Sequence, residues 1–372
     1  MTTLSNDSAD ISLFTESSTQ ETTVPRIRAN KVVGTYANLL RTVRDAGLLR
    51  RRRRFYLVFL SVLLSLFGAA WTGFVLLGDS WFQLIIAGVL GILLTQFAFY
   101  AHEAAHHQVF RTRWGNDWSA RVVGNLFVGM SFAYWMDKHG RHHTHPNQIN
   151  VDPDIATGAV VFHEEGGAGR SRLLTGFTRI QGYFLFPLLL FLGFTLHVDS
   201  IRYLLKPGEV RHRGFELAAI GVRLGGYLAI VFLFLPVGMA FAFVGVQVAV
   251  FGLYMGASFA PNHKGMPVIP EGSRVDFLSR QVLTSRSISG GRFIRTLMGG
   301  LNHQVEHHLF PDMARPNLRR AREIVKDHCA QQGIPYTETS LIASYGIVMR
   351  YLNEVGLKSA DPFECPAVRQ YR

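Results

Sequence analysis

Four long apolar segments constrain what this chain can fold into. Residues 55–77 and 81–100 form one pair, joined by a Gly-Asp-Ser turn, and residues 217–237 and 239–260 form a second pair. Each segment is close to the ~20 residues that a helix rising ~1.5 Å per residue needs to cross a ~30 Å hydrocarbon core. The chain is therefore predicted to be an all-α integral membrane protein with four transmembrane helices arranged as two hairpins.

The composition agrees with a membrane protein that also has a sizeable polar part. Hydrophobic residues make up 48% of the 372 residues, and the net charge is +12. Such a basic balance is typical of proteins that bind either nucleic acid or a membrane surface. The arginine run 50–54 leads directly into the first apolar segment, which favours the membrane, so we expect no nucleic-acid partner. By the positive-inside rule, this run places the N-terminus in the cytoplasm.

Three histidine-rich stretches, here named boxes one, two and three, lie at the edges of these segments. The chain has fifteen histidines, and more than half of them fall in or next to the boxes. Imidazole is the commonest metal ligand among side chains, and residues three or four apart share one face of a helix. Each box can therefore present several imidazoles together. The candidate ligands are His102, His106 and His107 in box one, His139, His142 and His143 in box two, and His307 and His308 in box three.

A further histidine, His263, follows the fourth apolar segment at the same membrane edge. Nine imidazoles exceed what one metal ion can bind, so they predict two metals with roughly four or five ligands each and an open position. Asn262 is a further candidate for the metal site. Asp152 and Asp154, near box two, are either partners of imidazole N–H groups or ordinary solvated carboxylates. The remaining histidines are predicted not to bind metal: His145, His163, His197, His212, His303 and His328.

The boxes can share metals only if they lie on one side of the membrane. An even number of crossings must then separate box two from box three. A fifth apolar run, residues 183–196, is short and contains Pro187, so it is predicted to lie at the interface. Both termini are then cytoplasmic. Arg223 lies near an end of the third crossing segment and is expected to reach the lipid headgroups.

The rest of the chain is predicted to be a disordered tail over residues 1–30, a membrane domain over residues 31–350 and a C-terminal tail over residues 351–372. Within the domain, residues 102–180 and 263–350 form a cytosolic helical cap. Apolar residues at helical spacing over residues 30–49 predict an amphipathic helix, either lying on the membrane or packed on the cap.

Box one also offers a different interpretation. His102-Glu103-x-x-His106 has the spacing of the zinc metalloproteases, in which the glutamate acts as a base. A membrane zinc protease would leave boxes two and three and His263 without a role, so the two-metal site is favoured. A metal-conducting protein would carry its histidines within the spans rather than at their ends.

The order H-x-x-x-H-H, H-x-x-H-H and Q-x-x-H-H, with a membrane hairpin before box one, resembles the membrane-bound fatty acid desaturases over roughly residues 30–350. The stretches Pro261-Asn262-His263 and Gly299-Gly300-Leu301-Asn302, and box three from Gln304 to Pro311, are similar to those of actinobacterial acyl-CoA desaturases of the stearoyl-CoA or linoleoyl-CoA type. Front-end and linoleoyl-type branches share the glutamine that opens box three, whereas animal Δ9 enzymes have histidine there. The resemblance therefore leaves the position of the double bond open.

The resemblance implies that the nine imidazoles hold two irons and that Gln304 lies beside, or replaces, one ligand. It implies an O2-dependent enzyme that inserts a cis double bond into a fatty acyl chain, with acyl-CoA as the expected carrier and Δ9 as one expected position. A membrane di-iron hydroxylase or monooxygenase is the alternative, because its iron chemistry is nearly the same. Candidate partners for coenzyme A phosphates are Lys264, Arg274, Arg280, Arg286 and Arg292, which a positive-inside surface explains equally well.

Electrons are expected to come from another protein. The sequence has two cysteines, no Cys-x-x-Cys pair, no His-Pro-Gly-Gly heme motif and no G-x-G-x-x-G fingerprint after a strand. A separate ferredoxin, rubredoxin or flavoprotein reductase is predicted to dock near the boxes. The expected location is a bacterial inner (plasma) membrane with the active site facing the cytoplasm.

Overall fold

The computed structural model describes residues 29–359, and for residues 29–34 it describes the backbone alone. Of the predicted tails at residues 1–30 and 351–372, residues 1–28 and 360–372 lie outside the described residues, whereas residues 29–30 begin a helix and residues 351–359 continue one. Within the described range, four helices are long and apolar enough to cross a membrane. They are α2 (Arg53–Leu77), α3 (Gln83–Ala105), α9 (Arg213–Phe234) and α10 (Val237–His263). The predicted spans differ from these helices only at their ends, so the all-α membrane architecture with two hairpins is confirmed.

The first hairpin turns at Gly78, whose φ of 60° lies in the left-handed region that favours glycine. The side-chain amide of Gln83 donates to the carbonyls of Phe74 and Gly78, both at 2.8 Å. These bonds satisfy carbonyls that the end of α2 leaves without a helical donor. A buried glutamine side chain thus stabilises the turn of the first hairpin.

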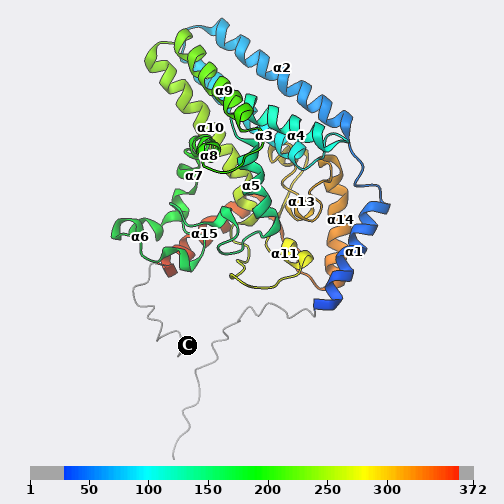
Figure 1. Cartoon of the computed structure of the whole chain (residues 1–372). Coiled ribbons are helices and arrows are strands. Elements are labelled where there is room, and N and C mark those ends of the chain that lie inside the picture. The colour runs from blue at the N-terminus through cyan, green and yellow to red at the C-terminus, as the bar shows by residue number, and fades with distance from the viewer. Residues whose placement is uncertain (1–28, 360–372) are drawn as a thin grey trace, which may run out of the picture.

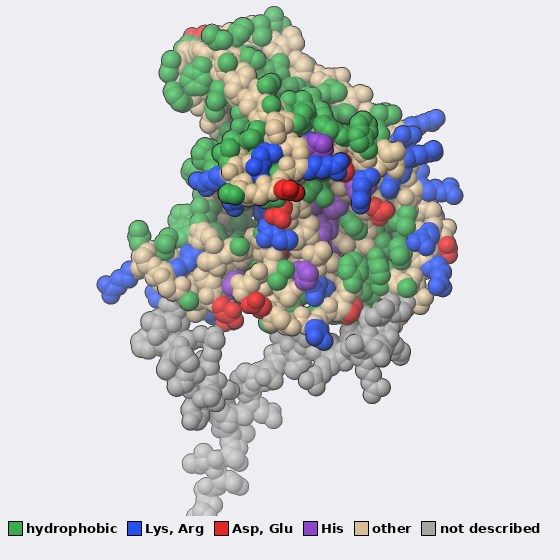
Figure 2. Space-filling view, in the orientation of Figure 1, with side chains coloured by type: hydrophobic (Ala, Val, Ile, Leu, Met, Phe, Trp, Pro, Cys, Tyr) green, Lys and Arg blue, Asp and Glu red, His purple; other side chains and the backbone are tan. Residues whose placement is uncertain are grey.

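The four spans gather at one end of the molecule, and the polar helices form a cap at the other (Figure 1). Hydrophobic side chains cover the visible surface of the spans, whereas charged side chains gather over the cap (Figure 2). The first and last described helices, α1 and α15, both lie in the cap, as an even number of crossings requires.

The cap is built from short elements joined by turns. Several of its helices begin at residues whose side chains accept a backbone N–H, such as Thr112, Ser131 and Asp276. Its elements are α1 (Ala29–Asp45), α4 (Arg113–Val123), the π-helical turn η1 (Gly124–Val128), α5 (Phe132–Thr144), η2 (Pro153–Ile155), η3 (Glu164–Gly167), α6 (Arg172–Thr178), α11 (Phe277–Leu283), α12 (Arg292–Leu297), α13 (Gln304–Leu309), α14 (Arg315–Gln332), α15 (Leu341–Ser359), and strands β1 (Ser287–Ser289) and β2 (Glu338–Ser340), which pair in parallel.

Helix α1 is the amphipathic helix predicted over residues 30–49. Its residues Leu39 and Val43 are buried in one core with Leu309 and Val325, so its apolar face packs on the cap, as one of the two alternatives predicts. At the other end of the chain, α15 continues to Ser359, past the predicted domain boundary at residue 350. Some residues of α15 beyond that boundary are still buried, so this part of the helix continues to pack on the protein.

The apolar run predicted to lie at the interface is a broken element. Helices η4 (Gln181–Phe184) and α7 (Leu185–Leu189) meet α8 (Leu192–Leu205) at a bend of 70°. Helix α8 packs closely on α10: a Cβ added at Gly193 would lie 2.5 Å from the carbonyl oxygen of Val248. A Cβ added at Gly252 would lie 2.6 Å from the carbonyl oxygen of Leu189. Small residues of this kind let membrane helices approach backbone to backbone.

Replacing Gly252 with valine is expected to force α8 away from α10. Overpacking a close contact typically costs about 1–3 kcal/mol, so thermal unfolding in detergent should shift to lower temperature. Gly245→Val is the matched control, because Gly245 lies on the same helix with nothing within 4 Å of an added Cβ. Equal melting temperatures for the two variants would contradict the close contact.

Candidate metal centre

The three boxes and His263 come from four elements that meet where the spans join the cap. Box one lies across the C-terminal end of α3, box two lies on α5, and box three lies on α13. His263 is the last residue of α10. The tight turn before box three needs glycine: Gly299 and Gly300 have φ of 58° and 84°. A Cβ added at Gly299 would overlap the ring of Phe99 on α3, so the turn rests directly on the helix that carries box one.

The first histidine cluster joins all three boxes. It contains five imidazoles, each with a ring nitrogen within 4.8 Å of the others: His102, His106, His139, His143 and His307. The Nε2 atom of His139 lies 3.0 Å from that of His102 and 2.8 Å from that of His106.

The second histidine cluster consists of His142, His263 and His308. The Nε2 atoms of His142 and His263 are 3.2 Å apart. The side-chain nitrogen of Gln304 lies 2.9 Å from Nε2 of His263, and Asn262 donates to the oxygen of Gln304 at 3.0 Å. Both amide candidates therefore lie at this cluster, with Gln304 facing His263 and Asn262 orienting Gln304.

The two clusters are contiguous. The rings of His143 and His308 stack with their centroids 4.3 Å apart, one ring from each cluster. Eight of the nine predicted imidazoles are thus brought together as a group of five and a group of three.

His107 belongs to neither cluster. Helix α3 ends at Ala105, and His107 adopts a left-handed φ of 58°. Its Nε2 atom lies 2.9 Å from a carboxylate oxygen of Asp117. The prediction assumed that box one is helical throughout, whereas the helix ends before its last histidine and turns that side chain away.

Hydrogen bonds to Nδ1 orient all three rings of the second cluster. Nδ1 of His142 lies 3.0 and 3.1 Å from the two carboxylate oxygens of Asp152, and Nδ1 of His263 lies 3.0 Å from the carbonyl oxygen of Thr284. Nδ1 of His308 lies 2.8 Å from the side-chain oxygen of Gln281. Such contacts fix Nδ1 as the protonated nitrogen and turn Nε2 toward the centre.

The two candidate aspartates therefore differ in what they contact. Asp152 is buried and paired with His142, whereas Asp154 forms an ion pair with Lys138 and lies 3.6 Å from Nδ1 of His142. Burial acts to raise the pKa of Asp152, but the neighbouring His142 outweighs it and holds that pKa below its usual value.

Burial lowers the pKa of several of the clustered imidazoles and so favours their neutral form. Burial, followed by the repulsion of neighbouring imidazoles, lowers the pKa of His139, His143, His307 and His308 well below the usual value. Burial and then the charge of His107 lower the pKa of His106 to about 3. Neutral imidazole is the form that binds metal.

The unpaired nitrogen atoms show that this donor set fits metal ions. The Nε2 atoms of His143, His307 and His308 are buried and have no hydrogen-bond partner. A buried polar atom without a partner is costly, and several Nε2 atoms facing one another cannot satisfy each other. A metal ion within each cluster would satisfy these nitrogens, and imidazole is a ligand that suits iron.

The glutamate of the protease-like spacing is engaged elsewhere. Glu103 forms a bidentate pair with Arg315, at 2.5 and 2.6 Å, and both side chains are buried. Its two carboxylate oxygens bind the guanidinium instead of facing a metal-bound water, so the zinc protease alternative has no base at this position. The pair ties α3 to α14 instead.

Sequence reasoning missed Gln281, Thr284 and Arg315 because they lie far along the chain from the boxes they support. It also proposed Arg286 as a phosphate partner. Arg286 is buried and donates to the carbonyl oxygens of Pro261 and Lys264, at 2.7 and 2.6 Å, so it supports the end of α10 that carries His263. His303 is buried but lies outside both clusters, as predicted.

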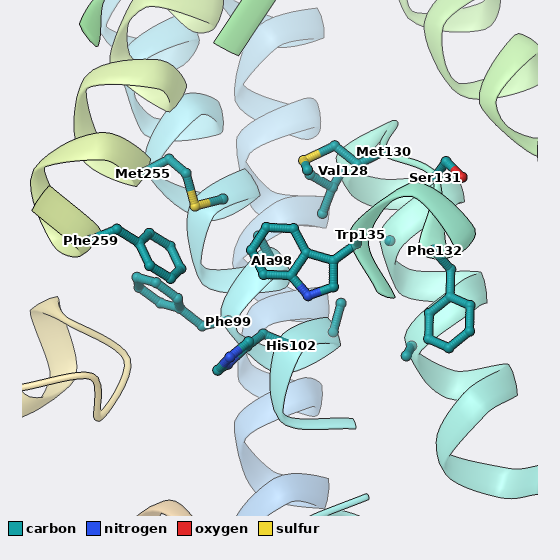
Figure 3. A pocket seen from close by; sticks show the side chains of 13 residues that line it. Ala98, Phe99, His102, Val128, Met130, Ser131, Phe132, Trp135, Met255 and Phe259 are labelled. Carbon is teal, nitrogen blue, oxygen red and sulfur yellow. The ribbon is translucent and has the colours of Figure 1, made fainter. Parts of the chain in front are cut away.

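A small apolar cavity of about 40 Å³ lies directly against His102 of the first cluster. Trp135 is one of the lining residues, and in Figure 3 its indole lies between Val128 and Met130 on one side and His102 on the other. The indole also stacks on His139, with centroids 4.7 Å apart. The cavity is lined by Phe99, His102, Val128, Met130, Trp135 and Phe259, among others.

Four spans with buried histidine clusters at their ends define a membrane protein with a histidine-rich site that could hold metal ions. The chain belongs to the fatty acid desaturase family, whose family model matches residues 79–340. It is 29% identical over 286 residues to the acyl-lipid (9-3)-desaturase of Physcomitrium patens, covering 74% of this chain and 54% of that protein. It is 28% identical over 340 residues to the Delta(6)-fatty-acid desaturase fat-3 of Caenorhabditis elegans, covering 87% of this chain and 75% of that protein.

The Delta(5) fatty acid desaturase fat-4 of Caenorhabditis elegans is 30% identical over 262 residues, covering 67% of this chain and 58% of that protein. The chain therefore spans about half the length of the moss relative and somewhat more of the nematode relatives. The narrower resemblance to actinobacterial acyl-CoA desaturases stays a prediction.

Asp152→Asn is expected to weaken metal binding by about 10- to 100-fold, because the amide orients His142 less strongly than the carboxylate does. The measurement is iron retained per chain during titration with a chelator. Asp199→Asn is the control, since Asp199 is exposed and pairs only with Arg202 at the surface. Iron retention equal to that of the control would show that Asp152 does not support a ligand.

A second pair of variants tests the position of His107. Removing the hydrogen-bond partner of a metal ligand typically weakens metal binding by about 10- to 100-fold. His106→Ala removes a clustered imidazole itself, so its loss of iron is expected to be larger. His107→Ala should retain iron. Iron content of the purified proteins is the measurement. Iron loss in His107→Ala, with the fold intact by circular dichroism, would return His107 to the ligand set.

Proposed function

We propose that this chain is a fatty acyl desaturase with a di-iron centre held by the eight clustered imidazoles, five at one iron and three at the other. The observation that carries this proposal is the apolar cavity that lies against His102. A saturated hydrocarbon chain has no polar group to bind, so only an apolar cavity can hold it beside the metal centre. Membership of the desaturase family supports the same reaction.

The bound irons would supply the oxidising power of O2, which removal of hydrogen from an unactivated methylene requires. The acyl chain loses two hydrogens from adjacent carbons. O2, with two electrons from a donor and two protons, leaves as two molecules of water. The double bond is proposed to be cis.

Side chains of the protein hold the acyl substrate in position. Phe99, Trp135 and Phe259 form apolar walls that exclude water and hold the methylenes beside His102. The stacking of Trp135 on His139 fixes one wall relative to a ligand. Gln304 lies beside His263 where the second cluster has fewer imidazoles, so its amide is proposed to complete that cluster directly or through a water.

The carrier and the double-bond position are finer proposals. We propose acyl-CoA as the carrier. Δ9 is one proposed position, and the Δ5 and Δ6 positions in the names of the nematode relatives are others, which Gln304 at the head of box three also supports. The arginine run before α2 supports a bacterial plasma membrane with the centre facing the cytoplasm, and a separate ferredoxin, rubredoxin or flavoprotein reductase is the proposed electron donor.

Expression in a host that lacks this activity should yield a new monounsaturated fatty acid, measured by mass spectrometry of the host lipids. His142→Ala should abolish this product, because it removes a ligand that Asp152 orients. His145→Ala is the matched control, since His145 lies just beyond box two and outside both clusters. A hydroxylated fatty acid would instead favour a hydroxylase, and lipids unchanged by the parent chain would contradict the proposal.

A further inference from the structure

One wall of the apolar cavity is the π-helical turn η1. Gly124 and Val128, at its two ends, line the cavity, and so does Met130 just after it. The turn ends at Gly129, whose φ of 84° stops the helix. π-Helical turns are rare and occur frequently at functional sites, which makes this one worth following outward.

The last carbonyls of the turn receive their hydrogen bonds from two other helices. A helix end leaves its final carbonyls without a helical donor. Nε of Arg223, on α9, donates to the carbonyl oxygen of Phe127 at 2.7 Å. Nε2 of His197, on α8, lies 3.0 Å from the carbonyl oxygen of Val128. The arginine that the sequence predicts to reach the headgroups is instead turned inward onto the cavity wall.

A third contact fixes the segments on either side of the turn. Glu216 on α9 is fully buried and accepts from Nε of Arg121 at 3.0 Å and from Oγ of Ser131 at 2.6 Å. Arg121 precedes η1 and Ser131 follows it. Helix α8 therefore contacts the carbonyl of Val128, and helix α9 contacts the carbonyl of Phe127 and the segments before and after the turn.

Ionisable side chains in membrane-spanning helices are costly and usually mark function, which applies to Arg223 on the span α9. Arg223 and His197 lie outside both histidine clusters, and each contacts the chain at a carbonyl of the cavity wall. His197 also packs tightly there, since a Cβ added at Gly129 would lie 3.1 Å from its ring. The shape of this wall thus depends on two donors that belong to neither the metal centre nor the cavity lining.

We propose that His197 and Arg223 are positioning residues that set the length of acyl chain the enzyme accepts, by fixing the π-helical turn that walls the cavity. This inference rests on the proposed desaturase function. Without the donors, the buried carbonyl of Val128 and the partly buried carbonyl of Phe127 must find new partners, and the turn must rearrange to provide them. Val128 and Met130 then move relative to His102, which changes the space available to the acyl chain beyond the metal centre.

The test is a competition between substrates in the full-length chain. A host that lacks the activity expresses each variant and is fed an equimolar mixture of even-numbered saturated fatty acids. Mass spectrometry then gives the ratio of desaturated products of different chain length. Arg223→Met and His197→Leu, which remove the donors, should change this ratio by about tenfold or more, the lower end of what one methylene contributes to discrimination in an apolar pocket.

Conservative variants separate positioning from a purely structural role. Arg223→Lys and His197→Gln keep a donor and should stay closer to the parental ratio than the apolar variants do. Arg202→Met is the matched control, because Arg202 is an exposed arginine on α8 whose ion-pair partner is Asp199. Loss of protein or iron alone, with an unchanged product ratio, would overturn the inference, because a structural role changes yield and leaves selectivity unaltered.

The cavity wall can also be altered directly if the apolar variants fail to accumulate. Val128→Phe should fill this end of the cavity and favour shorter chains, and Val128→Ala should favour longer ones. An unchanged ratio in both would overturn the inference. A parent chain that forms no new double bond would instead contradict the proposed function itself, so the two failures are distinguishable.

Discussion

The buried ion pair between Glu103 and Arg315 is the contact on which the rest of the structure depends. It joins the end of α3, which carries box one, to α14, which follows box three. Arg315 also lies over the ring of Phe59, and its backbone N–H donates to the hydroxyl oxygen of Tyr56 at 3.1 Å. Removing one partner of such a pair typically costs about 3–5 kcal/mol, because the other charge is left buried and alone. The ion pair therefore fixes the position of the cap relative to the membrane spans at the level of the histidines. The boxes can meet only because this relative position is fixed.

At that level, burial serves the chemistry directly. The imidazoles are enclosed and crowded, so the neutral form that binds metal is the one the fold stabilises. The rings of the second cluster are oriented by hydrogen bonds to Asp152, Thr284 and Gln281. These three residues lie in segments separate from the helices that carry the rings. The same enclosure leaves several nitrogens without a hydrogen-bond partner, which a bound metal ion would supply. Metal binding would then be coupled to the packing of the four elements that carry the clustered imidazoles.

The second hairpin has a role that its hydropathy does not reveal. Its helix α10 carries His263 and packs closely on α8 through glycines, while α9 supplies Glu216 and Arg223 to the segment beside the cavity. A hairpin needed only to anchor the protein would have no use for these buried polar groups. Their contacts connect the membrane bundle to the wall against which the substrate is proposed to lie.

The sequence by itself determined the four spans, the boxes and the family, because these are local patterns: apolar runs of sufficient length and histidines at helical spacing. It also identified all eight clustered imidazoles and Asp152 as a candidate hydrogen-bond partner of one of them. Only the tertiary structure decided that His107 turns away, that Glu103 is held by Arg315, that Arg286 supports α10, and that Arg223 points inward. Each of these depends on where a helix ends or on a partner far along the chain. Spacing along a single helix cannot reveal such contacts, because they arise only when distant segments pack together.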